Sequence, residues 1–135
     1  DTVMPGCVLH DFGDLVRTAA CPVSEDEMDL TKVTFLTDTY KAILDGYYQS
    51  THEFLEDNEI AGLAKAPLVI TFELGVRFLT DYLIGDTYFK VNYPEHNLNR
   101  AKVQFKLLRS MEEHQRLMEE TVASVCQPRG RLLTT

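Results

Sequence analysis

The residues of this chain that could do chemistry are few, and they stand far apart. Cys7 and His10 form a Cys-x-x-His pair, which is half of a zinc site. A structural zinc site needs four ligands, and the sequence offers no second pair at a suitable spacing, so a packed thiol is the favoured interpretation of Cys7. His52, His96 and His114 lack the His-x-x-x-His spacing of a helical metal site, and we expect them at the surface or at helix ends. Glycine-rich phosphate loops and a Gly-x-Ser-x-Gly nucleophile elbow do not occur.

The triplet Asp11-Phe12-Gly13 matches the metal-binding triplet of protein kinases. In those enzymes the triplet follows a strand and begins a flexible loop. Here it lies inside a stretch whose apolar residues recur every three or four positions, which is typical of a helix. We therefore assign no metal to this triplet.

Arg77 is the strongest candidate for a ligand contact. It lies in a segment, 68–84, that is apolar on nearly all sides, and burying an unpaired guanidinium there is costly. Its planar fork of donors suits sugar hydroxyls or phosphate oxygens. An ion-pair ladder is the alternative, since Glu73, Arg77 and Asp81 are spaced four residues apart.

The tyrosines form a second candidate group. Tyr40, Tyr47 and Tyr48 could stack on a sugar, but their helical spacing favours a place in the core. Tyr88 follows a helix stop at Gly85-Asp86, in a stretch where ligand contacts are common. The alternative for Tyr88 is that it packs against Phe89 and Tyr93.

Hydrophobic periodicity predicts an all-α fold in one domain, residues 1–126, followed by a flexible tail, 127–135. The expected helices cover 9–19, 37–50, 57–65, 68–84 and 97–125. Ser24-Glu25-Asp26-Glu27 has the order of a capping box, so a short helical turn or an acidic loop is expected there. Gly46 predicts the close approach of a neighbouring helix. Residues 2–4 are compatible with the end of a strand, and 86–95 with irregular or weakly β structure.

Composition excludes several classes of protein. The 135 residues carry 13 Lys and Arg against 21 Asp and Glu, and this net charge of −8 disfavours a nucleic-acid partner. The most apolar stretch is too short to span a membrane, and no signal peptide opens the sequence. Three cysteines at unrelated spacings argue against a disulfide framework and favour a cytoplasmic location.

Two motifs at separate places carry a resemblance to a known family. The first of the two places is the start of the chain, with Asp1-Thr2-Val3-Met4-Pro5-Gly6 followed by Leu9-His10-Asp11-Phe12-Gly13-Asp14, and the second is Gly85-Asp86-Thr87-Tyr88-Phe89. In these motifs the chain resembles small-molecule kinases of the aminoglycoside phosphotransferase and choline kinase type. The likeness is greatest to N-acetylhexosamine 1-kinases, some of which carry a mucin-desulfatase label. It extends over nearly the whole chain. Sulfatase activity finds no support, because the sequence lacks a Cys-x-Pro-x-Arg motif.

The resemblance implies that the chain is the helical C-terminal part of the large lobe of a protein-kinase-like fold. The complete enzyme would use ATP and Mg²⁺ to phosphorylate the anomeric hydroxyl of a sugar. Asp1 would be the second acidic residue of the metal-binding pair, Asp11 would support the catalytic loop, and Arg77 and Tyr88 would contact the sugar. For Asp11, a plain acid near a helix N-terminus remains the alternative. The catalytic base and the nucleotide-binding residues would lie upstream, so this fragment alone is expected to be inactive and to bind neither ATP nor Mg²⁺.

A truncated kinase should also expose an apolar face. We expect Val3, Met4, Val8, Phe12 and part of the Arg77 helix to form a patch that a dimer could cover. The competing hypothesis is a self-contained helical protein-interaction module without catalysis, whose long last helix binds a partner. An acidic residue on a strand two positions upstream of Asp1 in the gene would favour the kinase.

Overall fold

The structure, a computed structural model, describes residues 5–126 of the chain, and this part is helical without any strand. The prediction of an all-α fold is thus confirmed, whereas the expectations for Asp1, for a strand at 2–4 and for the tail 127–135 concern residues outside the described range. The elements are α1 (Pro5–Ala19), the 3₁₀ turn η1 (Leu30–Lys32), α2 (Thr37–Thr51), α3 (Asp57–Gly62), α4 (Ala66–Leu83), α5 (His96–Glu113) and α6 (Gln115–Val125). None of these helices is both long and apolar enough to cross a membrane.

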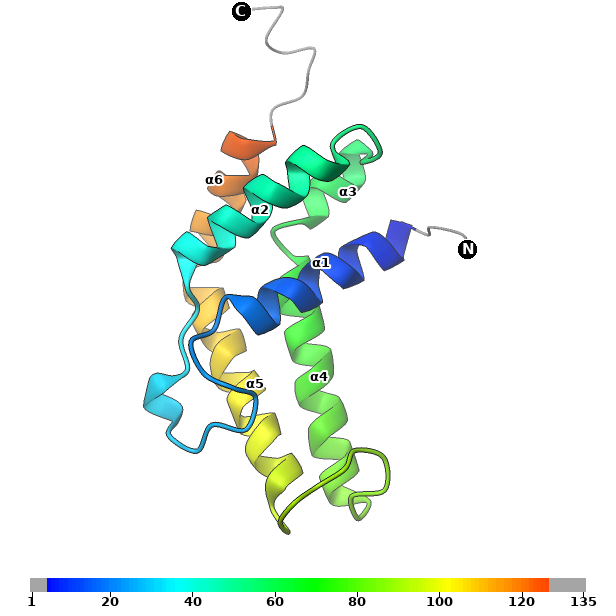
Figure 1. Cartoon of the computed structure of the whole chain (residues 1–135), viewed down its shortest axis with the longest axis vertical. Helices are drawn as coiled ribbons and strands as arrows, with labels where there is room; N and C mark the ends of the chain where they lie inside the picture. Colours follow the sequence, from blue (N-terminus) through cyan, green and yellow to red (C-terminus); the bar gives the residue numbers. More distant parts are fainter. Residues whose placement is uncertain (1–4, 127–135) are drawn as a thin grey trace, which may run out of the picture.

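Helices α4 and α5 lie side by side and form one half of the molecule, with the loop 84–95 between them (Figure 1). The other half consists of α2, α3 and α6. Helix α1 crosses α4 near its N-terminal end, between the two halves (Figure 1). The arrangement leaves the C-terminal end of α4 and the loop after it at one end of the molecule.

A glycine sets the distance between α1 and α4. A Cβ atom at Gly13 would lie 2.7 Å from the carbonyl oxygen of Ala66 and 2.8 Å from the Ile70 side chain. Because such contacts are shorter than real Cβ atoms make, the two helices can approach this closely only with glycine at this position. The close crossing therefore depends on Gly13 of the Asp11-Phe12-Gly13 triplet. This triplet lies within α1, as predicted.

The core forms where the two halves meet. Tyr40 is buried there, and its hydroxyl donates to the carbonyl oxygen of Leu63 at 3.0 Å. Burial raises the pKa of Tyr40 well above its usual range. The other large, fully buried apolar side chains are Phe12, Val16, Val33, Leu44, Leu63, Val103, Leu107, Met111 and Met118. The structure thus favours the core interpretation of Tyr40 over a sugar-stacking platform.

Phe12 corrects one part of the predicted apolar patch. Its side chain is 0% exposed and contacts the rings of Tyr40 and Tyr47, so it belongs to the core. Val8 is half-buried, and Val3 and Met4 lie outside the described residues. The part of the expectation that concerns the Arg77 helix is confirmed, because α4 exposes several apolar side chains.

The prediction of one long last helix over 97–125 is wrong, because the helix is interrupted at His114. The imidazole Nδ1 of His114 lies 2.8 Å from the carbonyl oxygen of Ser110. In a continuous helix, that oxygen would accept the hydrogen bond of the backbone N–H of His114. That N–H donates to Met111 instead, and the backbone turns to φ −112° and ψ 14°. The side chain thus replaces one helical hydrogen bond, and α6 begins at the next residue.

Of two smaller expectations, one is confirmed and one is corrected. Ser24 begins turns of an acidic loop, which was one of the two expected structures, and there its hydroxyl donates to Asp26 and Glu27 accepts from the amide of Asp29. Gly46 is exposed with nothing within 4 Å of a Cβ placed there, so no helix approaches it.

Candidate functional site

The candidate site lies at the C-terminal end of α4, where the chain turns sharply into the loop 84–95. Gly85 has a φ of 102° and Asp86 a φ of 60°, values that glycine adopts freely and other residues adopt less often. The amide of Asp86 donates to the carbonyl of Asp81 at 2.7 Å, and that of Gly85 to Tyr82 at 3.3 Å. This pair of bonds is a Schellman motif, and it confirms the predicted helix stop.

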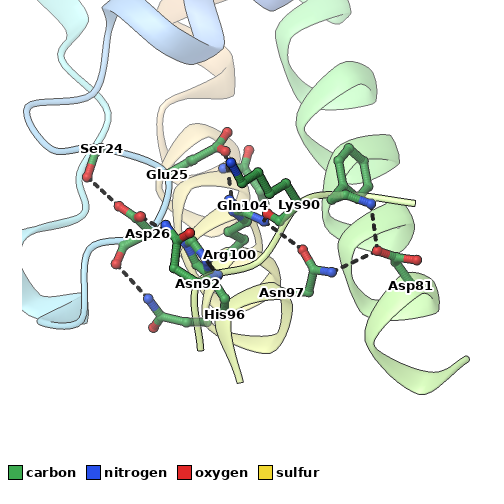
Figure 2. A network of polar contacts seen from close by, with 12 residues as sticks. Ser24, Glu25, Asp26, Asp81, Lys90, Asn92, His96, Asn97, Arg100 and Gln104 are labelled. Carbon is green, nitrogen blue, oxygen red and sulfur yellow. Dashed lines mark hydrogen bonds and ion pairs between the residues drawn. The ribbon is translucent and has the colours of Figure 1, made fainter. Parts of the chain in front are cut away.

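The carboxylate of Asp81 holds the loop in place. Its Oδ1 accepts from the amides of Thr87 at 2.9 Å and Tyr88 at 2.8 Å. Its Oδ2 accepts from the amide of Phe89 at 2.9 Å and from Nδ2 of Asn97, on α5, at 2.8 Å. Figure 2 shows Asn97 reaching from α5 toward Asp81. Asp81 therefore ties together the last turn of α4, the loop and the first turn of α5.

These hydrogen bonds decide the ionisation of Asp81. Burial disfavours its charged form, but the amides of Phe89, Tyr88 and Thr87 and the side chain of Asn97 all donate to the carboxylate, and the net effect lowers its pKa. Asp81 is therefore ionised at neutral pH, with its oxygens used by the loop. The predicted ladder of Glu73, Arg77 and Asp81 is not formed.

The ordered loop brings Tyr88 to Arg77. The guanidinium carbon of Arg77 lies 5.4 Å from the ring centre of Tyr88 and 5.6 Å from that of Phe89. The two rings meet edge to face, 4.8 Å apart. Arg77 is exposed, and within residues 5–126 no acidic side chain pairs with it. The two residues for which the sequence suggested a sugar contact thus stand beside one another.

Arg77 and Tyr88 line one open pocket of about 250 Å³. Its other walls come from Val76, Thr80, Asp81, Ile84 and Phe89. The pocket offers a guanidinium edge, a phenol and a hydroxyl beside apolar and aromatic surface, which is the mixture that a small polar ligand with one apolar face requires. Since the Asp81 carboxylate already accepts hydrogen bonds from three backbone amides and from the side chains of Thr87 and Asn97, the residues that line the pocket hold no free carboxylate, imidazole or thiol, and the arrangement suits binding.

The other predicted site residues lie elsewhere. Asp11 is exposed on α1, six residues after the first residue of that helix, and so is not a helix-start acid. Two polar residues of the loop 84–95 lie outside the lining of the Arg77 pocket: Asp86 accepts a hydrogen bond from Nδ2 of Asn97 at 3.0 Å, and the amide of Asn92 donates to Nδ1 of His96 at 3.1 Å. Asp1, the predicted metal ligand, is not among the described residues.

A second polar cluster is centred on His96, which is the first residue of α5 and for which the sequence predicted a place at the surface or at a helix end. His96 is 2% exposed, and its Nε2 lies 3.0 Å from Oδ2 of Asp26. Because Nδ1 accepts the amide of Asn92, the proton is on Nε2 and is donated to Asp26, which also accepts from the Ser24 hydroxyl at 2.8 Å (Figure 2). The hydrogen bonds from His96 and Ser24 outweigh the effect of burial and lower the pKa of Asp26. The cluster fastens the acidic loop after α1 to the start of α5, 70 residues later in the chain.

An arginine pair lies next to this cluster. Arg17 is nine-tenths buried and donates to Asp14 at 2.8 and 3.0 Å and to Gln104 at 3.3 Å. Glu25 lies 4.0 Å from Arg17 and 3.5 Å from Arg100. These contacts link α1, the acidic loop and α5, and we assign them a structural role.

In the described part of the chain, no three His, Cys, Asp or Glu side chains lie close enough together to hold a metal ion. His10 lies 3.8 Å from Glu73, and the Cys7 side chain is not described. A comparison with known protein families finds no family model that matches the chain. The site itself must therefore carry the functional argument.

Proposed function

We propose that this chain is the acceptor-side, helical part of an ATP-dependent sugar kinase similar to N-acetylhexosamine 1-kinases, and that the Arg77 pocket receives the sugar. The observation that supports the proposal is the meeting of Arg77 and Tyr88 in one pocket. The sequence predicts a sugar contact for both residues, for Arg77 from its charge in an apolar helix and for Tyr88 from the family resemblance. Tyr88 lies eleven positions after Arg77 in the sequence, and the loop held by Asp81 makes them neighbours.

The chemistry of the pocket fits a sugar. The exposed face of the Tyr88 ring, 71% accessible as a residue, suits the apolar C–H face of a pyranose. The free donors of the Arg77 guanidinium suit its hydroxyls or an incoming phosphoryl oxygen. In such a kinase Mg²⁺ neutralises charge on the phosphoryl group that ATP transfers, and a catalytic base accepts the proton of the attacking sugar hydroxyl. The role of this chain is to hold and orient the acceptor.

Sugar binding tests the proposal directly. N-acetylglucosamine and N-acetylgalactosamine would be titrated into the ¹⁵N-labelled chain, at a protein concentration where it is monomeric. We expect saturable shifts confined to the Arg77 side-chain Nε–H and the amides of residues 76–89. Arg77→Ala and Tyr88→Ala should each abolish these shifts, whereas Arg109→Ala, an exposed arginine on α5, should leave them unchanged.

Shifts that occur equally with sucrose, or that survive both pocket substitutions, would contradict the proposal. The gene offers a second test. A reading frame that continues upstream of Asp1 with a strand and an acidic residue two positions earlier would support the kinase.

The alternative function, a helical interaction module without catalysis, is favoured by a different observation. Apolar side chains on the outer face of α4 remain exposed, among them Val69 and Phe72. The partner surface would then be α4 rather than the last helix of the original hypothesis, because that helix is divided at His114. A chain that binds no sugar in the titration, but does bind a protein through α4, would support this function.

A further inference from the structure

Helix α4 is apolar on two opposite faces, and the described residues cover only one of them. One face, with Ile70, Thr71 and Phe78, is buried. On the other, Val69, Phe72, Val76 and Leu83 are exposed. Their spacings of three, four and seven residues place these four on a single stripe along the helix, which we call the α4 outer stripe. A helix that is apolar all round is normally covered on both sides.

We propose that the α4 outer stripe packs against the same stripe of a second copy of this chain, with the two α4 helices antiparallel about a two-fold axis near Val76. Val69 and Leu83 each lie seven residues, two helical turns, from Val76. A two-fold axis there places Val69 of one copy beside Leu83 of the other. It also places Phe72 over Thr80 of the other copy, and Val76 against itself.

The charges beside the stripe select this orientation. Glu73 and Arg77 flank it on the same side, four residues apart. In an antiparallel pair, Glu73 of each copy lies beside Arg77 of the other, which gives two opposite-charge contacts related by the axis. In a parallel pair, Glu73 and Arg77 of one copy lie on the opposite side of the interface from those of the other copy, so these contacts do not form. The sequence of this face is therefore complementary to itself in one orientation only.

Both charged side chains are available for such contacts. Glu73 is half-exposed, and its ion pair with the half-exposed His10 is long, at 3.8 Å. Arg77 touches only aromatic rings among its described neighbours. A second copy thus offers each of them a partner that the monomer does not supply.

Sedimentation with charge-reversed variants tests the pairing. One helix pair is a small interface, so we expect a monomer–dimer equilibrium with a dissociation constant between about 1 μM and 1 mM. Glu73→Arg alone and Arg77→Glu alone each create two like-charge contacts and should weaken the dimer by about tenfold or more. The double variant carrying both substitutions should restore it to within about threefold, because the contacts are opposite in charge again.

A chain that stays monomeric up to about 1 mM would overturn the proposal, as would a double variant weaker than either single variant. Val76→Asp, at the axis, should abolish the dimer, whereas Leu15→Asp should not, since Leu15 is an equally exposed apolar residue on α1 away from the stripe. Circular dichroism of each variant establishes that it folds. If Val76→Asp does not fold, the variants of the exposed residues Glu73 and Arg77 still test whether the dimer forms through the α4 outer stripe.

Cross-linking tests the antiparallel orientation. A Val69→Cys variant mixed with a Leu83→Cys variant should form a disulfide between the two different chains, identified by peptide mapping against the native cysteines. A bond between two Val69→Cys chains would overturn the orientation. These measurements contain no sugar, so their outcome is independent of the proposed kinase function, even though Arg77 takes part in both.

Discussion

At the scale of single residues, the decisive group is one that holds the site without being its binding surface. Asp81 accepts three consecutive backbone amides of the loop and the side chain of Asn97. Its position within α4 made it look like the end of an ion-pair ladder. Its actual partners are amides, which no pattern of side-chain types reveals. The meeting of Arg77 and Tyr88 depends on this carboxylate.

Asp81→Asn should loosen the loop while leaving the helices folded. The amide group of asparagine places donors opposite some of the donors of residues 87–89, so part of the network is lost. We expect faster hydrogen exchange at the amides of Thr87, Tyr88 and Phe89, a lower melting temperature and weaker sugar binding. Glu112→Gln, the same carboxylate-to-amide change at an exposed position on α5, should alter none of these.

Arg77→Ala should affect ligand binding far more than stability. In the proposed sugar kinase, losing a charged hydrogen bond to the sugar should cost about 1–3 kcal/mol, seen as a lower kcat/KM. The folded chain loses only its contacts with two exposed rings, about 1 kcal/mol or less. Kinetics and thermal denaturation of the same variant separate these effects, and unchanged kinetics with a markedly lower melting temperature would show that Arg77 is structural.

At the scale of elements, the packing of α1 on α4 predicts opposite effects for two glycines. Gly13→Ala would place a methyl group 2.7 Å from the Ala66 carbonyl, which forces the helices apart and should cost about 1–3 kcal/mol. Gly46→Ala meets no atom within 4 Å in an exposed part of α2 and should stabilise the chain by about 0.5–1 kcal/mol. Urea denaturation measures both, and similar effects of the two changes would contradict the close crossing of α1 and α4.

Hydrophobic periodicity predicted most of the elements, because it records which face of a helix is buried. It placed α2 at 37–50 and α4 at 68–84, against observed helices of Thr37–Thr51 and Ala66–Leu83. It missed the break at His114, since the spacing of apolar residues continues through a break made by one side-chain hydrogen bond. It also could not distinguish the covered face of α4 from the open one, because both are apolar.

The candidate site was predictable in part for the same reason. Arg77 stands out as a charge in an apolar helix, and Gly85 as a helix stop, so both could be found from the sequence. The cluster of His96, Asp26 and Ser24 could not, because its members are joined only by the path of the chain in space.

At the scale of the whole molecule, the long connection between α1 and α2 is bonded to α5 from near one end of that helix to near the other. His96 binds Asp26 near one end of α5, and near the other the Ser110 hydroxyl accepts the amide of Phe35 at 2.9 Å. The connection thus takes part in the fold through polar contacts with α5 as well as through Val33 and Phe35, which are buried in the core. Loss of these contacts should lower the stability of the whole molecule and should not affect the connection alone.

This architecture predicts how the protein responds to acid. Asp26 and Asp81 both have a pKa below the ordinary value of 3.8, so the folded chain binds their protons less readily than the unfolded chain does. Their contribution to stability is complete above that value and is lost as the pH falls through the folded pKa of each group. Unfolding in urea between pH 7 and pH 2 should therefore show a decrease below about pH 4.

Variants identify the groups responsible for that decrease. Asp26→Asn and Asp81→Asn should each be less stable than the unsubstituted chain at pH 7 and approach its stability near pH 2, where the native carboxylates are protonated. The curve of Glu112→Gln should instead keep the shape of the unsubstituted curve, because no buried donor faces that exposed side chain. A constant difference from pH 7 to pH 2 for the two aspartate variants would mean that their hydrogen bonds stabilise the fold equally well without the charge, and that the acid response originates in other carboxylates.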